Sequence, residues 1–183
     1  LTGADIMSTT NYGGSPEMCY RAAPERTQST GDYSKRIWVN MYKAINQANI
    51  ILDALPDATG EDSEKNDLKG QCLAIRGICY FNLIMNYQQT YAIAKDKRGV
   101  ILRTSSSDPE SMGFSTVQQC YDQILKDLKE AKTLLAGYDR TDMWRLNADV
   151  VSGQLARVYQ VMGDWSNALS EAKSVYDKYN TLM

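Results

Sequence analysis

The side chains best suited to surface chemistry in this sequence are its amphipathic aromatics. It contains twelve Tyr and three Trp but only two Phe. Such rings offer a flat apolar face and, at the edge, a polar group that hydrogen-bonds. The aromatics in irregular segments are the better candidates, although packing is the competing role for each of them. The candidate ligand-binding residues are Tyr12, Tyr20, Tyr33 and Tyr91, with Asn11, Arg21 and Arg26 nearby in sequence.

Residues for catalysis or metal binding are poorly supplied. The sequence has no His, which excludes His triads, His general bases and His metal ligands. Its carboxylates alternate with Lys, as in Lys126-Asp127 and Lys129-Glu130, a pattern typical of a solvated helix face. The four Cys show no Cys-x-x-Cys spacing. We therefore expect no catalytic residue, no cofactor, no metal site and no enzymatic activity.

The near balance of basic and acidic residues bears on which classes of partner the chain could bind. The 20 basic and 22 acidic residues give a net charge of −2, which favours neither nucleic acid nor an anionic membrane as a partner. No apolar run approaches the ~20 residues that span a bilayer. The chain begins at Leu1 without a signal-peptide pattern and ends at Met183 without a helix stop. We interpret it as a fragment of a longer protein.

Apolar periodicity predicts long helices separated by one long irregular segment. Residues 1–33 are rich in Gly, Ser, Thr, Pro and Tyr, and we expect an irregular N-terminal loop region there. Apolar steps of three and four predict helices over Ser34–Leu55 and Ser63–Tyr87, with Pro56 ending the first. The period is lost over residues 88–113, which predicts a long insertion loop.

A third helix and a closing hairpin complete the pattern. The third helix starts near Ser115 or Thr116, and Gln118 or Gln119 three residues on fits a capping box. The segment from about Asn147 to Tyr179 predicts two further helices joined by a tight turn. Strand signals are nearly absent, so the predicted fold class is all-α.

The closing hairpin follows the tetratricopeptide pattern. Small Ala156 and large Tyr159 lie on its first helix, and Gly163-Asp164 makes the turn. Trp165 begins the second helix and packs back, and Ala168 keeps the two helices close. Such hairpins bury their apolar faces only by stacking on neighbours. The pattern therefore indicates a helical scaffold.

A degenerate copy of this hairpin comes earlier in the chain. Gly77 and Tyr80 take its small and large positions, and the 88–113 insertion replaces its tight turn. The aromatic residues on helical stripes are expected to pack in the core: Trp38, Tyr80, Tyr159 and Trp165. Two polar residues on packed helices, Asn49 and Arg76, are expected to be buried hydrogen-bonding groups that fix helix contacts.

The order of these segments resembles the SusD/RagB family. The similar segments are Trp38 to Leu52, Gly70 to Leu83, Gly99 to Leu102, Thr116 to Leu135 and Leu155 to Ala168. Three residues depart from the family's usual pattern: Gln71 stands for Glu, Gly77 for Ala and Ile101 for Pro.

The resemblance implies a fold, a ligand and a partner. Residues 34–183 become a SusD-like N-terminal helical platform with tetratricopeptide-like hairpins, in a fragment that lacks the lipid anchor. The resemblance also implies a surface-exposed outer-membrane lipoprotein of Bacteroidota, which binds a glycan or similar nutrient and delivers it to a SusC-like TonB-dependent transporter. Sugar C–H groups would then stack on the candidate aromatic rings. The alternative is a tetratricopeptide-type adaptor for protein partners, with no glycan role.

Overall fold

The computed structural model describes residues 32–140 and 142–179. The chain divides into two compact units, residues 1–40 and 41–183. Helix α3 (Asp32–Ala54) runs from the first unit into the second. It begins earlier than the predicted Ser34, so the expected irregular region does not extend to residue 33.

Within the second unit, α3 presents one buried face and then stops at a proline. Ile45, Ala48 and Asn49 are buried, and their spacing of three and four residues places them on one side of the helix. A 3-10 turn, η1 (Leu55–Asp57), follows directly, with Pro56 in its first turn. Proline is tolerated there because the first N–H groups of a helix have no partner within it.

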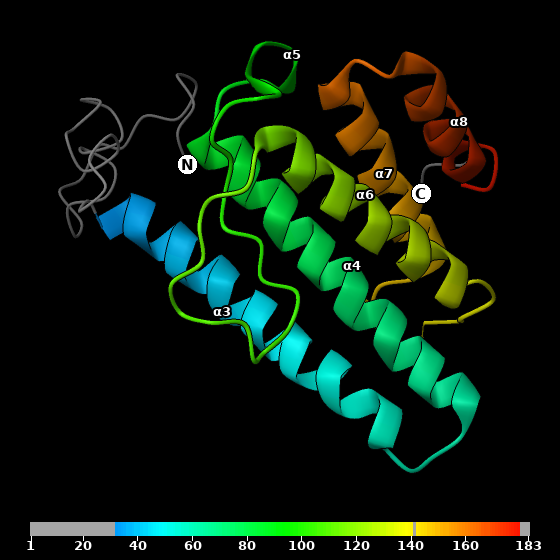
Figure 1. Ribbon diagram of the computed structural model, residues 1–183. Helices are drawn as coiled ribbons and strands as arrows, with labels where there is room; N and C mark the ends of the chain where they lie inside the picture. The colour runs from blue at the N-terminus through cyan, green and yellow to red at the C-terminus, as the bar shows by residue number, and fades with distance from the viewer. Residues whose placement is uncertain (1–31, 141, 180–183) are drawn as a thin grey trace, which may run out of the picture. The chain divides into compact units, whose positions relative to one another are not determined.

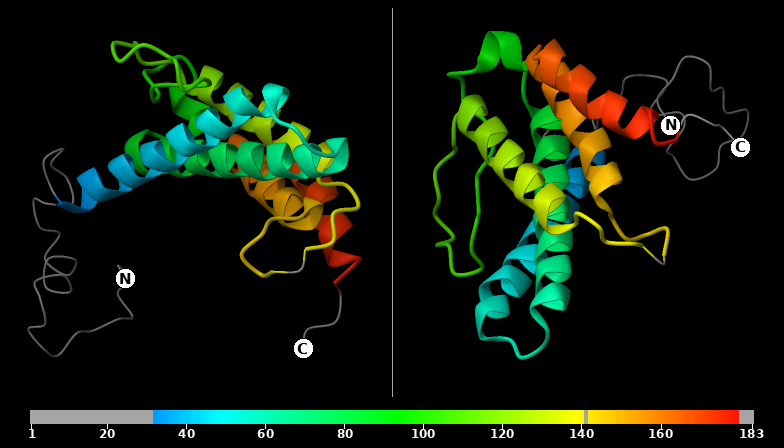
Figure 2. Two further views of the ribbon diagram at one scale, coloured as in Figure 1. Left: turned by 90° about the horizontal axis from the view of Figure 1, so that it is seen from below. Right: turned by 90° about the vertical axis from the view of Figure 1, so that its right-hand side faces the viewer.

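Four long helices make up most of the second unit: α4 (Asp62–Tyr87), α6 (Val117–Leu134), α7 (Ala148–Met162) and α8 (Trp165–Tyr176). Helix α4 packs on α6, α6 on α7, and α7 on α8 (Figures 1 and 2). Each helix therefore contacts mainly its neighbours in the series, as expected for stacked helical hairpins.

The contact between α4 and α6 is close because α4 carries a glycine there. A Cβ atom added to Gly77 would lie 3.0 Å from Cγ of Leu128. Leu128 and its neighbour in the packing, Ile124, are fully buried. The glycine at this position thus allows the two helices to approach closely.

The predicted hairpin of α7 and α8 is present. Gly163 ends α7 with φ +78°, a left-handed conformation that glycine adopts without steric cost. Asp164 then caps α8, its side chain accepting from the N–H of Asn167. Ala156 and Ala168 are half-buried.

The expected burial of the helical aromatics is met by only some of them. Tyr80 and Tyr159 are buried. Trp38, in the first unit, is half-buried. The expectation for Trp165 is wrong, because this side chain is 67% exposed and α8 has no buried residue at all. A first-turn position on the outermost described helix leaves Trp165 with no further element to pack against among the described residues.

The connection from α4 to α6 is long but not wholly irregular. It contains the short helix α5 (Tyr91–Ala94) and an isolated antiparallel bridge between Arg98 and Thr116. Thr116 and Gln119 form the capping box of α6, as predicted. The described residues contain no β-strand, so the all-α class is confirmed. None of the described helices has the length and apolar character to cross a membrane.

Candidate functional site

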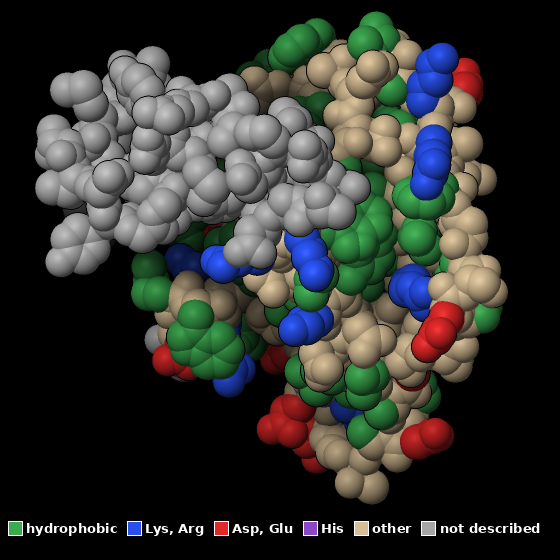
Figure 3. Space-filling view, turned by 90° about the vertical axis from the view of Figure 1, so that its left-hand side faces the viewer, with side chains coloured by type: hydrophobic (Ala, Val, Ile, Leu, Met, Phe, Trp, Pro, Cys, Tyr) green, Lys and Arg blue, Asp and Glu red, His purple; other side chains and the backbone are tan. Residues whose placement is uncertain are grey.

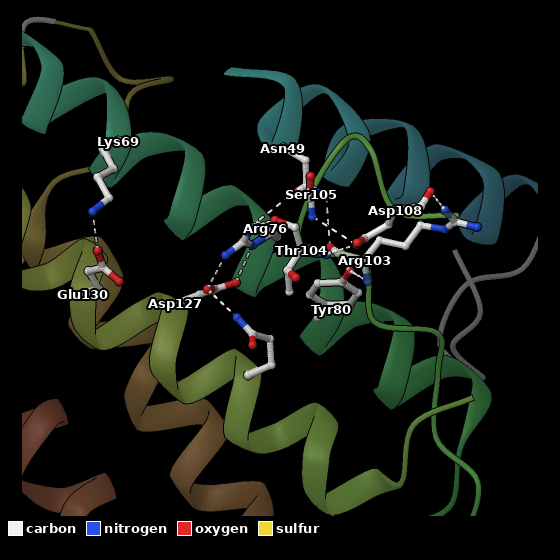
Figure 4. A network of polar contacts seen from close by, with 11 residues as sticks. Asn49, Lys69, Arg76, Tyr80, Arg103, Thr104, Ser105, Asp108, Asp127 and Glu130 are labelled. Carbon is white, nitrogen blue, oxygen red and sulfur yellow. Dashed lines mark hydrogen bonds and ion pairs between the residues drawn. The ribbon is translucent and has the colours of Figure 1, made fainter. Parts of the chain in front are cut away.

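A buried arginine links α3, α4, α6 and the long connection (Figure 4). Arg76 on α4 is 6% exposed. Its Nε and Nη2 each donate to one carboxylate oxygen of Asp127 on α6, both at 2.7 Å. Its Nη1 donates to Oδ1 of Asn49 on α3 at 2.9 Å and to the main-chain oxygen of Thr104 at 3.1 Å. One side chain therefore joins three helices and a loop.

Asp127 is the residue of this network whose position differs from the prediction. The alternation Lys126-Asp127 predicted a solvated face, but Asp127 is buried. Its carboxylate also accepts from Nε2 of Gln123 at 2.8 Å. The solvated-face expectation was wrong because charge alternation along the sequence does not show which residue points inward at a helix contact.

Burial and pairing act in opposite directions on this ion pair. Burial raises the pKa of Asp127, whereas the contact with the guanidinium lowers it. Burial by itself would lower the pKa of Arg76, but the hydrogen bonds and charge of Asp127 leave that pKa raised. We take the pair as ionised at neutral pH, because two charge-assisted hydrogen bonds of 2.7 Å hold it.

Two tyrosine hydroxyls bind the main chain of the connection. The Tyr42 hydroxyl donates to the oxygen of Ile101 at 2.8 Å and accepts from its N–H at 3.0 Å. The Tyr80 hydroxyl makes the same pair of bonds with Arg103, at 2.7 and 2.6 Å. Asn49 Nδ2 also donates to the oxygen of Arg103 at 3.0 Å, so the main chain of this residue makes three such bonds. Residues 99–110, called the anchored loop below, are thus fixed through their backbone.

These hydroxyls are protected from titration. Burial raises the pKa of Tyr42 to about 12, and it raises the pKa of Tyr80 further. Both residues therefore stay protonated donors throughout the physiological range. Their ability to donate and accept at once depends on that proton.

The outer part of the anchored loop is held by its own polar groups and by Asp53 on α3. The guanidinium of Arg103 donates to the main-chain oxygens of Asp108 and Glu110. Asp108 accepts from the N–H of Thr104 at 2.7 Å. Asp53 on α3 accepts from Ser106 N at 2.6 Å, and hydrogen bonds from Ser106 hold its pKa below the usual range. The loop is therefore rigid and polar.

The predicted ligand-binding residues are not brought together among the described residues. Tyr91, expected in an irregular segment, lies in α5 and is 6% exposed. Its hydroxyl donates to Oε1 of Gln118 at 2.6 Å, and its ring lies 4.8 Å from that of Tyr121. The ring of Tyr91 is thus packed in the core, and its hydroxyl is hydrogen-bonded within the protein.

The remaining candidates give no site geometry. Tyr33 lies in α3 and not in a loop, and its side chain is outside the described part. Four others of the predicted ligand-binding set, together with Arg26, lie outside the described residues: Tyr12, Tyr20, Asn11 and Arg21.

A second loop carries the exposed aromatic that sequence reasoning missed. Between α6 and α7, Trp144 is 75% exposed and Met143 is also exposed. The guanidinium of Arg145 lies 4.9 Å from the centroid of the Trp144 ring, and its Nη1 donates to the Tyr138 hydroxyl at 3.0 Å. The signal in the sequence was a Trp followed directly by Arg145, outside any apolar period.

This second loop is anchored at its end nearer α7. The side-chain amide of Gln71 on α4 donates to the main-chain oxygen of Leu146 and accepts from its N–H, the latter at 2.9 Å. A glutamate at this position would have no N–H to donate to that oxygen. Glutamine therefore completes a pairing with Leu146 that glutamate could make only in part.

Figure 3 shows charged side chains of both signs on the uncovered part of one face of the molecule. Basic and acidic side chains of the described residues are interspersed with apolar ones there. The described residues also contain no group of three or more Cys, Asp or Glu side chains arranged to hold a metal ion.

Comparison with known proteins identifies the family to which the chain belongs. A SusD-like family model, described as "Starch-binding associating with outer membrane", matches residues 6–160. The chain belongs to this SusD-like family. No curated protein matches it.

Solved structures agree with this assignment. A SusD-like carbohydrate binding protein from Bacteroides vulgatus is 29% identical, with a TM-score of 0.83 over 90% of this chain. A SusD superfamily protein from Bacteroides thetaiotaomicron is 26% identical, with a TM-score of 0.79 over 97% of this chain and 39% of its own. A laminarin binding SusD-like protein is 25% identical, with a TM-score of 0.65 over 76% of this chain and 29% of its own. The chain spans 36% of the first of these proteins.

Proposed function

We propose that the chain is the helical part of a surface nutrient-capture protein that binds a glycan and does no chemistry on it. The observation that carries the proposal is the family match over residues 6–160, to a family described as starch-binding. Similar structures include a carbohydrate binding protein and a laminarin binding protein. Their ligands make plant or algal glucans the first class to test.

The described geometry supports a binding role. The stacked helices form a rigid base, and buried side chains fix the main chain of the anchored loop to it. A rigid loop loses little conformational entropy when it meets a ligand or partner, so more of the contact energy remains for affinity. The proposed location is the outer-membrane surface, reached through a lipid anchor, and the proposed partner is a SusC-like TonB-dependent transporter.

The test is binding to a polysaccharide panel. The 183-residue chain and the full-length protein that contains it are run in native gels cast with soluble starch, laminarin, xylan or pectin. We expect retarded migration in at least one glucan gel, confirmed by calorimetry. Free migration of the full-length protein in every gel would contradict the glycan role.

The partner is tested separately. A tagged full-length protein is purified from detergent-solubilised outer membranes of its host, and co-purifying proteins are identified by mass spectrometry. We expect a TonB-dependent transporter in stoichiometric amount. Recovery of the protein from the soluble cytoplasmic fraction, bound to other proteins, would favour the adaptor alternative.

A further inference from the structure

The loop between α6 and α7 projects away from the helices in both views of Figure 2. At its end nearer α7 it carries Trp144, 75% exposed, beside the exposed side chain of Met143. Trp165 is also strongly exposed, at 67%, so exposure alone does not mark a site. Trp144 differs in the charged and hydroxyl-bearing groups that hold its ring. Nothing in the packing of the described helices requires an indole at this place.

The indole is held in position from one side. The guanidinium of Arg145 stacks over the Trp144 ring at 4.9 Å from its centroid. The same guanidinium donates to the Tyr138 hydroxyl at 3.0 Å and lies 3.7 Å from the carboxylate of Asp142. Arg145 is therefore fixed between a phenol and a carboxylate, and it covers one face of the ring. The high exposure of Trp144 leaves the opposite face in contact with solvent.

The backbone that carries this ring is also fixed. Gln71 pairs both main-chain groups of Leu146, two residues after Trp144. Asn147 then caps α7, its side chain accepting from the N–H of Val150 at 3.0 Å. The ring thus stands on a segment that is tied to α4 and to the start of α7, which limits the entropy lost on binding.

We propose that Trp144 and Arg145 form a saccharide-binding platform. A pyranose ring stacks its C–H face on the free face of the indole, which is the contact that a flat, apolar, π-rich surface favours. Arg145 supports the indole from its other face, where Tyr138 and Asp142 hold the guanidinium. Tyr138 and Gln71 are positioning residues, since each holds the platform without facing the sugar. This proposal rests on the glycan role proposed above.

The platform fits a saccharide better than a protein partner. A protein hot spot is normally an aromatic surrounded by other apolar side chains that exclude water. Here the side chain over the Trp144 ring is the charged Arg145, which is itself bound to Tyr138 and lies beside Asp142. Polar groups around one flat ring suit a ligand that is itself apolar on its face and polar at its edge.

The test compares two exposed tryptophans of the same chain. Trp144→Ala removes the platform, and Trp165→Ala removes an indole that is 67% exposed on α8. Both variants are measured in the full-length protein, with whichever of soluble starch or laminarin the unmodified protein binds. We expect Trp144→Ala to weaken binding about tenfold or more, the size of effect expected for losing one stacking partner. Trp165→Ala is expected to leave affinity unchanged.

Further variants separate stacking from positioning. Trp144→Tyr keeps a flat ring and is expected to restore most of the affinity. Arg145→Ala removes the guanidinium that supports the ring, and is expected to weaken binding about as strongly as Trp144→Ala. Gln71→Glu leaves Trp144 in place but loosens its backbone, so the expected loss is smaller, roughly two- to fivefold.

The outcomes distinguish this proposal from the function on which it rests. If the protein binds a glucan and Trp144→Ala binds equally well, the platform is refuted and the glycan role stands. Equal losses from Trp144→Ala and Trp165→Ala would also refute it, since they would reflect general aromatic adhesion. If the unmodified full-length protein binds no polysaccharide of the panel, both proposals fall together.

Discussion

The two loops that flank α6 differ in how many side chains of the helices bind their main chain. The anchored loop before α6 has its main chain bound by buried side chains: Tyr42, Asn49, Arg76 and Tyr80. The loop after α6 has one such clamp, at Gln71, and its largest side chains face solvent. In this molecule the longer loop is bound to the helices at more places, and the shorter loop presents the more accessible aromatic, Trp144.

The largest effect is expected from breaking the ion pair beneath the anchored loop. Arg76→Met or Asp127→Leu leaves the other charge buried without its partner, which costs about 3–5 kcal/mol of unfolding free energy. The double variant is expected to cost less than either single variant, because no unpaired charge remains. Urea denaturation followed by circular dichroism measures all three.

A matched control joins the same two helices. Lys69 on α4 and Glu130 on α6 form an ion pair at 2.6 Å, but both side chains are well exposed. Breaking it with Lys69→Met is expected to cost about 0–1 kcal/mol. Equal costs for the buried and exposed pairs would show that the Arg76 network adds nothing to ordinary surface pairing.

The next effect is expected from removing one hydroxyl. Tyr80→Phe leaves the N–H and the carbonyl of Arg103 without that partner, at a cost of about 1–3 kcal/mol. Hydrogen exchange at the amide of Arg103 should accelerate while exchange in α7 is unchanged. Tyr176→Phe makes the same chemical change at an exposed position on α8 and should leave stability unaltered. Unchanged exchange at Arg103 would refute the anchoring role of Tyr80.

The same hydroxyls predict a loss of stability at high pH. Burial raises the folded-state pKa of Tyr42 to about 12 from its ordinary 10.0. The folded state therefore holds its proton more tightly than the unfolded state does. The resulting stability is complete below pH 10 and is lost as pH rises toward 12. Urea denaturation at pH 8 and pH 11 should show a smaller difference for Tyr42→Phe than for the unmodified protein.

A smaller effect is expected from the clamp on the second loop. Gln71→Glu keeps an acceptor for the N–H of Leu146 but loses the donor to its carbonyl, at a cost of about 1 kcal/mol. The amide of Leu146 should exchange faster, and the anchored loop should not change. Gln160→Glu on the exposed face of α7 provides the control. A loss spread over both loops would show that they are not independently held.

The smallest effect on stability is expected from the exposed indole. Trp144→Ala should change the unfolding free energy by less than about 0.5 kcal/mol, because surface side chains contribute little to folding. Thermal unfolding measures this directly. A loss of several kcal/mol would mean that the indole is packed in the folded protein, which its exposure contradicts.

Apolar periodicity predicted the helices because tertiary packing in this fold runs along helical stripes. Spacing also located the α7–α8 turn at Gly163 and the capping box at Thr116, since both depend on local backbone chemistry. Arg76 and Asn49 were expected to be buried hydrogen-bonding groups, and the structure has them so. The loop residues that these side chains bind could not be predicted. They are bound through main-chain atoms, so their side-chain types give no sign of the contact.

The errors share one physical cause. Tyr91 was expected to be accessible because it lies in a segment without helical period, yet a four-residue helix turns it inward against Tyr121. Asp127 was expected in solvent because Lys precedes it, yet it is the buried partner of Arg76. Trp165 was expected in the core because the hairpin pattern places an aromatic there. Each depended on which neighbour lies across a helix contact, and a single sequence does not carry that information.

The contacts that hold the anchored loop determine which of its residues tolerate substitution. Hydroxyl, amide and guanidinium groups hold it by peptide atoms that every residue type except proline supplies. The tip of the loop is held differently, because the Ser105 and Ser106 hydroxyls donate to Asp53 on α3 at 2.9 and 2.8 Å. Side chains at Ile101 and Arg103 can therefore change without loss of the main-chain bonds to Tyr42 and Tyr80, whereas replacement of the two serines removes a side-chain contact with α3.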